Sequence, residues 1–318
     1  MIIEILHETK LEYSEPASEW LTELRMQPAS DEQQSCHSFH LAVSQPTNVF
    51  WYLDGFGNRV HHFNLLAPHQ QVRVLAASVV ETTVPSRRLA DSLATFPLAT
   101  AADPCEVLDF LPFRGPVCDS ARLQTIRREL APADGCRVAD WIERVGGYIS
   151  ERFEYQRDVT DSTSTIDHLL ETGKGVCQDF AHLMIAVLRS YGVPARYVSG
   201  YIHRPDKESQ SHAWCEVWLP DVGWRGFDPT NCCEASDWFV RVAVGRDYSD
   251  VPPNRGTHRG GADETIRVRV ATRELPRLPS LSWHEHLQPL DVPSTSLQRP
   301  RHGALGDEQL QQQQQQQQ

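Results

Sequence analysis

The sequence predicts an α+β protein in which an antiparallel β domain precedes a core that packs a helix on an antiparallel sheet. Residues 1–85 contain short runs in which apolar and polar side chains alternate, as they do in half-buried strands. Residues 121–272 instead mix helical and alternating spacing along the chain. Within this second part, residues 173–188 start with two glycines and become apolar at helical spacing, which indicates one buried helix.

The N-terminal part, residues 1–85, is interpreted as a β-sandwich-like domain. Its alternating runs cover residues 3–13, 39–43, 49–53, 59–66 and 72–80. The third and fourth runs flank D-G-F-G-N, whose residues suit a hairpin turn. Several short strands at this spacing are typical of packed antiparallel layers. The histidines after the first run lack acidic or cysteine partners at ligand spacing, so core or solvated roles are favoured over a metal site.

Three further segments complete the predicted organisation. Residues 86–120 are rich in Pro, Ala and Asp and are interpreted as a connector that packs on the surface. The core is assigned to residues 121–272, with its helices before residue 190 and its strands after it. The predicted strands of the core are 195–202, 211–219, 224–227 and 265–271. Residues 273–318 are rich in Pro, Ser and Gln and end in eight glutamines, which predicts a disordered tail.

Composition narrows the class of protein. The 318 residues are 40% hydrophobic, enough for a core, and their net charge of −12 argues against non-specific nucleic-acid binding. No apolar run reaches the length of a membrane span, and Glu4 interrupts the apolar start, so no signal peptide is predicted. The eight cysteines are scattered without C-x-x-C pairs, which favours a reducing compartment and a cytoplasmic localisation. No cofactor or membrane partner is expected, and the oligomeric state stays open.

The cysteine near the start of the central apolar segment is the first candidate for chemistry. The segment begins G-K-G-V-C-Q-D-F, which places Cys177 at or near the N-terminus of a buried helix. Unpaired backbone N–H groups and the helix dipole favour a thiolate at that position, and the thiolate is the nucleophilic form. A lone cysteine is more often a small buried hydrophobic residue, so Cys177 by itself would not indicate a nucleophile.

Two later segments supply the partners that a nucleophilic cysteine needs. Ser211–Leu219 alternates as a strand with His212 at its start, and a second short strand ends at Asp228. Between them, P-D-V-G is turn chemistry, so the two strands form a hairpin that brings His212 and Asp228 to neighbouring ends. Cysteine, histidine and aspartate in this arrangement are a nucleophile, a base and the group that orients the base.

These segments together resemble the bacterial transglutaminase-like family, which has a papain-like core. The matching motifs are G-V-C-Q-D-F-A-H-L at 175–183, G-V-P-A-R-Y-V-S-G-Y at 192–201, S-H-A-W at 211–214, G-F-D-P-T-N at 226–231, L-R-M-Q-P at 24–28 and D-G-F-G-N at 54–58. The resemblance covers most of residues 1–272. It implies that Cys177, His212 and Asp228 are the catalytic residues, acting on a peptide or protein substrate.

The reaction itself has alternatives. Hydrolysis of an amide through a thioester is favoured, because nothing in the sequence marks a dedicated amine site. Transfer of the acyl group from glutamine to an amine is the second interpretation, and a catalytically silent binding module is the third. The terminal glutamines could serve as acyl donors, although a low-complexity extension is the simpler interpretation.

Several other residues are compatible with a functional or a structural role. Cys215 with Cys232 and Cys233 could form a zinc site beside His212, but a packed role is favoured because C-x-x-C spacing is missing. Asp179 is expected to satisfy a partner near the start of its helix. The backbone N–H of Gln178 could donate to an oxyanion. The segment V-A-V-G-R-D-Y-S-D-V-P-P at 242–253 also matches the family. Its Arg246, Asp247 and Asp250 could shape the mouth of the cleft, but pairing with one another in a turn is favoured.

Overall fold

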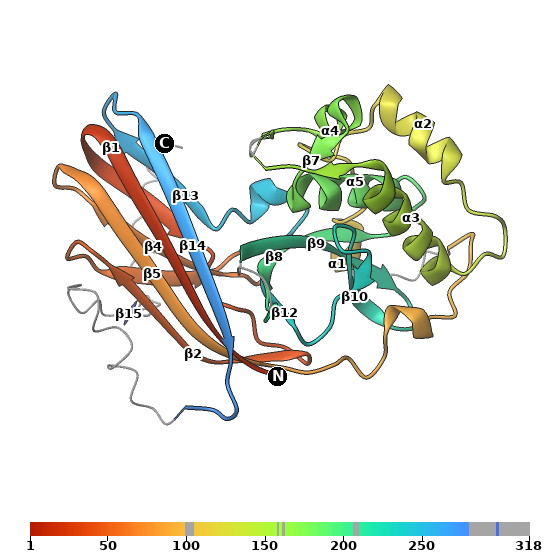
Figure 1. Cartoon of the computed structure of the whole chain (residues 1–318), viewed down its shortest axis with the longest axis horizontal. Coiled ribbons are helices and arrows are strands. Elements are labelled where there is room, and N and C mark those ends of the chain that lie inside the picture. The colour runs from red at the N-terminus through yellow and green to blue at the C-terminus, as the bar shows by residue number, and fades with distance from the viewer. Residues whose placement is uncertain (99–104, 158, 161–162, 206–209, 280–296, 299–318) are drawn as a thin grey trace, which may run out of the picture.

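The protein has two lobes that lie side by side (Figure 1). The computed structural model describes residues 1–98, 105–157, 159–160, 163–205, 210–279 and 297–298. Long antiparallel strands form one lobe, and helices packed on a shorter sheet form the other. The polyglutamine tail lies outside the described residues, so its predicted disorder stays a prediction.

The first lobe is organised around one long strand that belongs to two layers. Its strands are β1 (Ile2–Leu24), β2 (Gln34–Val43), β3 (Val49–Leu53), β4 (Arg59–Leu65), β5 (His69–Thr82), β13 (Asn254–Arg259), β14 (Glu264–Glu274) and β15 (Leu297–Gln298). The first half of β1 pairs with β5 and β14, and the second half pairs with β4 and β13. Side chains from both halves, among them Leu11 and Trp20, share one core with Phe63 and Val72. This is the sandwich-like arrangement that the alternating runs predict.

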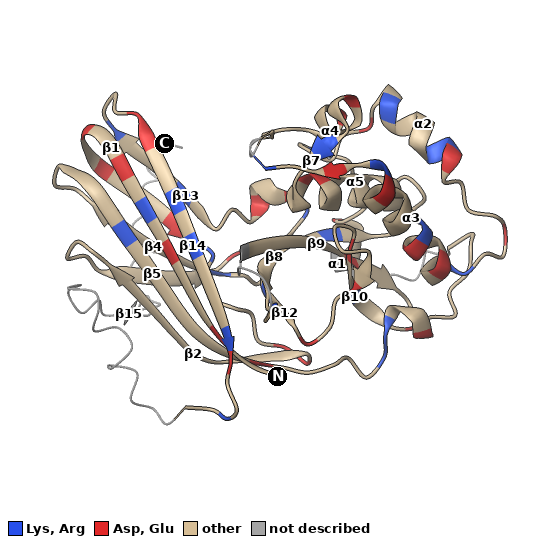
Figure 2. Ribbon diagram, in the orientation of Figure 1, with Lys and Arg blue, Asp and Glu red and all other residues tan. Residues whose placement is uncertain are grey.

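The last predicted strand lies in a different place from the one expected. The sequence assigns residues 265–271 to the core, whereas β14 pairs with β1 along its length. Alternation identifies a strand but not its partner, and here the partner is selected across about 250 residues of chain. Complementary charges support the pairing: Arg273 donates to Glu4 at 2.6 Å, and Arg267 lies 3.7 Å from Glu12. Figure 2 shows these alternating charges along the two strands.

The second lobe packs helices against a five-stranded antiparallel sheet in the order β11-β10-β9-β8-β12. Its elements are η1 (Leu89–Asp91), α1 (Cys105–Leu108), α2 (Ala121–Glu129), α3 (Val138–Arg152), β6 (Glu154–Tyr155), α4 (Ile166–Thr172), β7 (Lys174–Gly175), α5 (Cys177–Arg189), β8 (Ala195–Ile202), β9 (Gln210–Leu219), β10 (Gly223–Asp228), β11 (Cys233–Glu234), β12 (Phe239–Gly245) and η2 (Tyr248–Asp250). Helix α5 is buried from Asp179 to Arg189 and packs on β8 and β9. The sequence does not predict β12, because a strand buried on both faces has no alternation.

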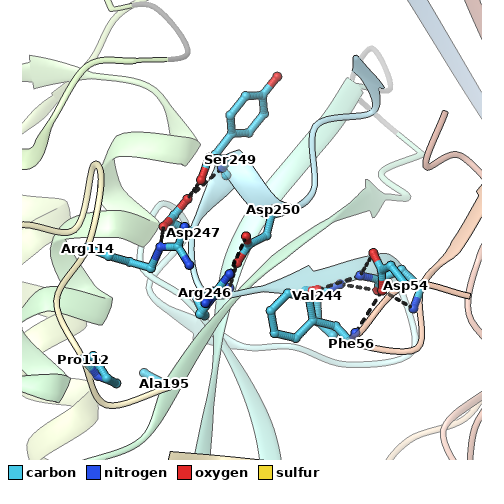
Figure 3. Close-up of polar contacts among 12 residues, drawn as sticks. Asp54, Phe56, Pro112, Arg114, Ala195, Val244, Arg246, Asp247, Ser249 and Asp250 are labelled. Carbon is cyan, nitrogen blue, oxygen red and sulfur yellow. Dashed lines mark hydrogen bonds and ion pairs between the residues drawn. The ribbon is translucent and has the colours of Figure 1, made fainter. Parts of the chain in front are cut away.

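The hairpin turn between β3 and β4 joins the two lobes (Figure 3). The Asn58 side chain donates from Nδ2 to the Val244 carbonyl at 2.8 Å and accepts from the Val244 N–H at 2.8 Å. This amide therefore pairs with the backbone of β12 much as a neighbouring strand would. Asp54 holds the turn by accepting from the backbone N–H groups of Phe56 and Asn58, each at 3.0 Å. The Phe56 ring lies 5.3 Å from the guanidinium of Arg246.

A second contact between the lobes is a buried hydrogen bond from β1 to β8. His7 Nδ1 lies 2.8 Å from the Tyr201 hydroxyl, and the His7 Nε2 lies 3.3 Å from the Thr9 hydroxyl. Burial lowers the pKa of His7 to about 4, so the ring is neutral at pH 7. Neutral hydrogen bonds therefore contribute to the interface, beside the ion pair between Arg241 and Asp31.

Candidate functional site

Two short elements, α4 and β7, precede the cysteine in the chain. Helix α4 ends at Gly173, whose φ of 73° is left-handed and therefore suits glycine. Strand β7 then pairs with β6, with Gly175 opposite Tyr155. A Cβ on Gly175 would lie 2.9 Å from the Asp179 side chain, so only glycine leaves room for that carboxylate. Helix α5 begins immediately afterwards at Cys177, as the sequence predicts.

Asp179 fixes the start of α5. Its Oδ2 accepts from the Val176 N–H at 2.8 Å and from the Thr160 hydroxyl at 2.8 Å. Burial raises the pKa of Asp179, although the bonds from Val176 and Thr160 oppose that effect. The prediction that this residue satisfies a partner near the helix start is confirmed. The backbone N–H groups of Cys177 and Gln178 occupy the first helical turn, where no intrahelical acceptor exists.

His212 and Asp228 meet at the open end of the β9–β10 hairpin. The hairpin pairs Leu219 with Gly223 beside the turn and Cys215 with Phe227 near the other end, as the sequence predicts. His212 Nε2 then lies 2.7 Å from Asp228 Oδ2. The imidazole is 9% exposed and the carboxylate is fully buried, so little water competes for this bond.

Asp228 is held by more than the histidine. Its Oδ1 accepts from the Thr230 N–H at 2.8 Å and the Asn231 N–H at 3.3 Å, and its Oδ2 also accepts from the Asn231 side-chain amide. Burial alone would raise the pKa of Asp228, but the bonds and charge from His212, with those from Asn231 and Thr230, hold it below its usual value. The carboxylate is therefore ionised at neutral pH. The sequence patterns did not single out Asn231. Its position three residues after the aspartate was the one indication that it could bind that carboxylate.

Cys177, at the start of α5, also acts on the imidazole. Burial alone would lower the pKa of His212, but its hydrogen bonds to Asp228 and Cys177, together with their charges, raise it to about 10. Because Nε2 is bound to Asp228, Nδ1 is the ring nitrogen left for the sulfur. The structure thus brings together all three residues that the sequence singles out.

Aromatic rings fix the plane of the imidazole. His212 is stacked with Trp214 at 26° with centroids 6.2 Å apart, and Phe239 lies at the same centroid distance. Trp214 reaches this position across Gly200, where a Cβ would lie 2.6 Å from the indole ring. Gly200 pairs with His212 in the β8–β9 ladder. The glycine is therefore needed for close packing beside the histidine.

The remaining candidates have structural surroundings. Cys215 donates to the Phe227 carbonyl at 3.3 Å, and burial raises its pKa. Burial also raises the pKa of Cys233 to about 11, which disfavours the thiolate that a metal would need. Within the described ranges, no group of three or more His, Cys, Asp or Glu side chains is arranged to hold a metal ion. The charged pair Arg246 and Asp250 bind each other at 2.8 Å, as expected (Figure 3).

The chain belongs to the bacterial transglutaminase-like family. Residues 128–229 match the transglutaminase-like superfamily, and residues 3–81 match the bacterial transglutaminase-like N-terminal region. An uncharacterized protein of Mycobacterium leprae is 33% identical over 280 residues, which are 84% of this chain and 97% of that protein. An uncharacterized protein of Mycobacterium tuberculosis is 29% identical over 269 residues, 79% of this chain and 86% of that protein.

Two further similarities place the fold and part of the core. A solved structure of a candidate cysteine protease from Cytophaga hutchinsonii superposes with a TM-score of 0.72 at 22% identity, over 88% of this chain and 93% of that one. It shares the α+β fold described above. A protein-glutamine gamma-glutamyltransferase of Pseudomonas aeruginosa is 37% identical over 84 residues, only 22% of this chain and 12% of that protein. No helix in the described part of the chain is both long and apolar enough to cross a membrane.

Proposed function

We propose that the protein is a thiol-dependent hydrolase or acyltransferase that acts on amides of peptide-like substrates, with Cys177 as nucleophile, His212 as base and Asp228 as the orienting group. One observation carries the proposal: a buried imidazole bonded to a carboxylate through Nε2 at 2.7 Å, with a pKa that is also raised by a cysteine at a helix start. Family membership supports it, because transglutaminase-like proteins are generally enzymes of the Cys-His-Asp type. A silent binding module would not need all three groups in contact.

The chemistry follows from the charges of these groups. The thiol proton moves to His212, and the sulfur of Cys177 attacks the amide carbonyl carbon. The backbone N–H of Gln178, in the first turn of α5, is the proposed donor to the tetrahedral oxyanion. The imidazolium of His212 then protonates the leaving ammonia or amine as the carbon–nitrogen bond breaks, which leaves a thioester. Water or a second amine, deprotonated by His212, attacks the thioester and releases the thiol.

Hydrolysis is the preferred outcome, and amine transfer is the second candidate. The similarity to the Pseudomonas gamma-glutamyltransferase favours transfer, but it covers only 22% of this chain. No feature of the described residues marks an amine site beside Cys177. Water, which needs no dedicated site, is therefore the expected acceptor.

One experiment separates the two reactions. The purified full-length chain is incubated with glutamine-containing peptides, with and without cadaverine, and ammonia release, amine incorporation and main-chain cleavage are measured together. We expect ammonia release or cleavage without incorporation. Incorporation that exceeds hydrolysis would establish the transferase, and main-chain cleavage would establish a peptidase.

Three variants test the assigned residues in the same assay. Cys177→Ala should abolish turnover, while Cys232→Ser, which changes an exposed cysteine, should keep it. Asp228→Asn preserves size but favours the wrong imidazole tautomer, so the rate should fall by roughly 10²- to 10⁴-fold with the fold retained. Full activity in Asp228→Asn would reduce Asp228 to a turn residue before Pro229, since asparagine also serves turns.

A further inference from the structure

A cavity of about 410 Å³ lies apart from the Cys177–His212–Asp228 group. Its wall combines the segment after β5 with residues of β10, β11 and the following turn. Val84, Pro85 and Trp238 supply apolar surface, and Arg88 and Arg225 supply cationic groups. Ligand pockets in proteins start at roughly 300 Å³, so this volume suits a small molecule rather than a single water.

The charges of this wall are unbalanced. Within the described part of the chain, neither Arg88 nor Arg225 forms an ion pair within 4.0 Å. Arg225 donates two of its N–H groups to backbone carbonyls, at 2.5 and 2.6 Å, and not to a carboxylate. The acidic side chain in the wall, Glu234, already accepts two backbone N–H groups from η1, at 3.0 Å each. Two guanidinium groups and one carboxylate therefore line the cavity, which leaves its wall with a net positive charge.

A smaller cavity of about 30 Å³ shares Gly226, Ala235 and Ser236 with the first. Trp214 lines it and is only 2% exposed, yet its indole Nε1–H has no hydrogen-bond partner among the described residues. The buried Ser236 hydroxyl likewise has none within that part of the chain. An indole N–H can only donate, so the missing partner is an acceptor.

Gly226 lines both cavities and lies against the Trp214 indole. A Cβ at this position would lie 2.6 Å from the Ala235 Cβ and 3.2 Å from the Trp214 Nε1. Its φ is outside the left-handed region, so the backbone does not demand glycine here. The absence of a side chain instead leaves room beside the Trp214 Nε1, an atom that is itself buried.

We propose that the joined cavities bind a small carboxylate-bearing molecule, of the size of an N-acylated amino acid or dipeptide. The unpaired guanidiniums of Arg88 and Arg225 recognise the carboxylate, and the Trp214 N–H with the Ser236 hydroxyl recognises an amide carbonyl. A single water in the smaller cavity would satisfy the indole but would leave both guanidiniums without an anion. Because Trp214 is stacked on His212, the ligand would contact the residue that packs on the imidazole.

Binding is tested on Cys177→Ala, so that the result does not depend on the proposed catalysis. The probes are N-acetylalanine and acetyl-Ala-Ala, each as the free acid and as the C-terminal amide, titrated by calorimetry. We expect saturable binding of the acid and at least about tenfold weaker binding of the amide. Arg88→Gln should weaken acid binding by about tenfold. Arg128→Gln, an equal charge change on the exposed face of α2, should leave it unchanged.

A second readout reports on the indole directly. In protein labelled with ¹⁵N-tryptophan, the Trp214 Nε1–H resonance, assigned through Trp214→Phe, should shift with the acid. The same saturation should appear in calorimetry and in this resonance. Any one of three results would overturn the proposal. They are equal binding of acid and amide, unchanged affinity in Arg88→Gln, and no saturable binding together with an indole resonance that does not shift. Arg88 is exposed and makes no described ion pair, so its substitution tests binding without endangering the fold.

Discussion

At the scale of single residues, the charge of His212 follows from its two partners. Burial alone would favour the neutral ring, but a buried carboxylate on one nitrogen and the cysteine on the other raise the pKa of His212 to about 10. The raised pKa favours the ring that has taken the thiol proton, an imidazolium beside the Asp228 carboxylate and the Cys177 sulfur. A positive charge beside Cys177 is the setting in which a thiolate is stabilised.

This charge predicts how Cys177 reacts with alkylating agents. A free thiol, with a pKa of about 8.5, is nearly all protonated at pH 6 and reacts slowly there. Because the His212 imidazolium persists across this range, iodoacetamide should modify Cys177 at pH 6 at least about tenfold faster than free cysteine. Mass spectrometry locates the modified residue.

His212→Ala is the matched variant for this measurement. Removing the imidazolium should return the pH 6 rate toward that of free cysteine, while the exposed Cys232 should label equally in both proteins. If Cys177 labels no faster than Cys232 at pH 6 in the unsubstituted chain, the cysteine is an inert packed residue and the assigned nucleophile is wrong.

At the scale of elements, local sequence patterns predicted which segments form helices and hairpins better than they predicted which segments and side chains bind one another. The glycines before Cys177 and the apolar spacing after it predicted α5, and the turn residues P-D-V-G predicted the β9–β10 hairpin that joins His212 to Asp228. Helical period and hairpin chemistry are short-range properties, so a sequence displays them directly. Strand β12 was not predicted because both of its faces are buried. Asn231 was not predicted because a side chain that orients another produces no periodic pattern in the sequence.

The start of α5 offers a test at this scale. Asp179→Ala removes the acceptor of the Val176 N–H and the Thr160 hydroxyl, in a side chain that is 2% exposed. Loss of such a buried acceptor should lower the free energy of unfolding by about 1–3 kcal/mol, measured by urea denaturation. Turnover should fall as well, because Cys177 is anchored only through this turn.

Asp140 provides the matched control, because it occupies the same third position of α3 and pairs with Arg137 at 2.9 Å on the surface. Its carboxylate is 58% exposed, so Asp140→Ala should change the free energy of unfolding by less than about 1 kcal/mol. Equal losses in the two variants would mean that Asp179 acts only through general helix electrostatics and not through its buried bonds.

At the scale of the whole molecule, the two lobes are interleaved in the chain. The sequence predicted sandwich-like layers and a helix-on-sheet core, and the structure contains both, although β14 belongs to the first lobe and not to the core. It could not show that β13 and β14 return to β1, because pairing across most of the chain depends on which edges stay open after the other strands have paired. Nor could it show that the D-G-F-G-N turn binds β12, since a turn motif encodes its own conformation and not its docking site.

That docking predicts that Asn58 stabilises the whole molecule rather than the hairpin alone. Asn58→Ala removes the donor and the acceptor that pair with Val244 at 2.8 Å each, in a side chain that is 5% exposed. Two buried backbone groups lose their partners, so the free energy of unfolding should fall by about 2–4 kcal/mol. Amide exchange at Val244 should accelerate at the same time, because its N–H loses its acceptor. Asn64→Ala, an exposed position on the next strand, should change stability by less than about 0.5 kcal/mol. If Val244 stays protected in Asn58→Ala, the side-chain amide does not hold β12, and other contacts between the lobes hold it instead, among them the Gln34–Arg241 and His7–Tyr201 hydrogen bonds.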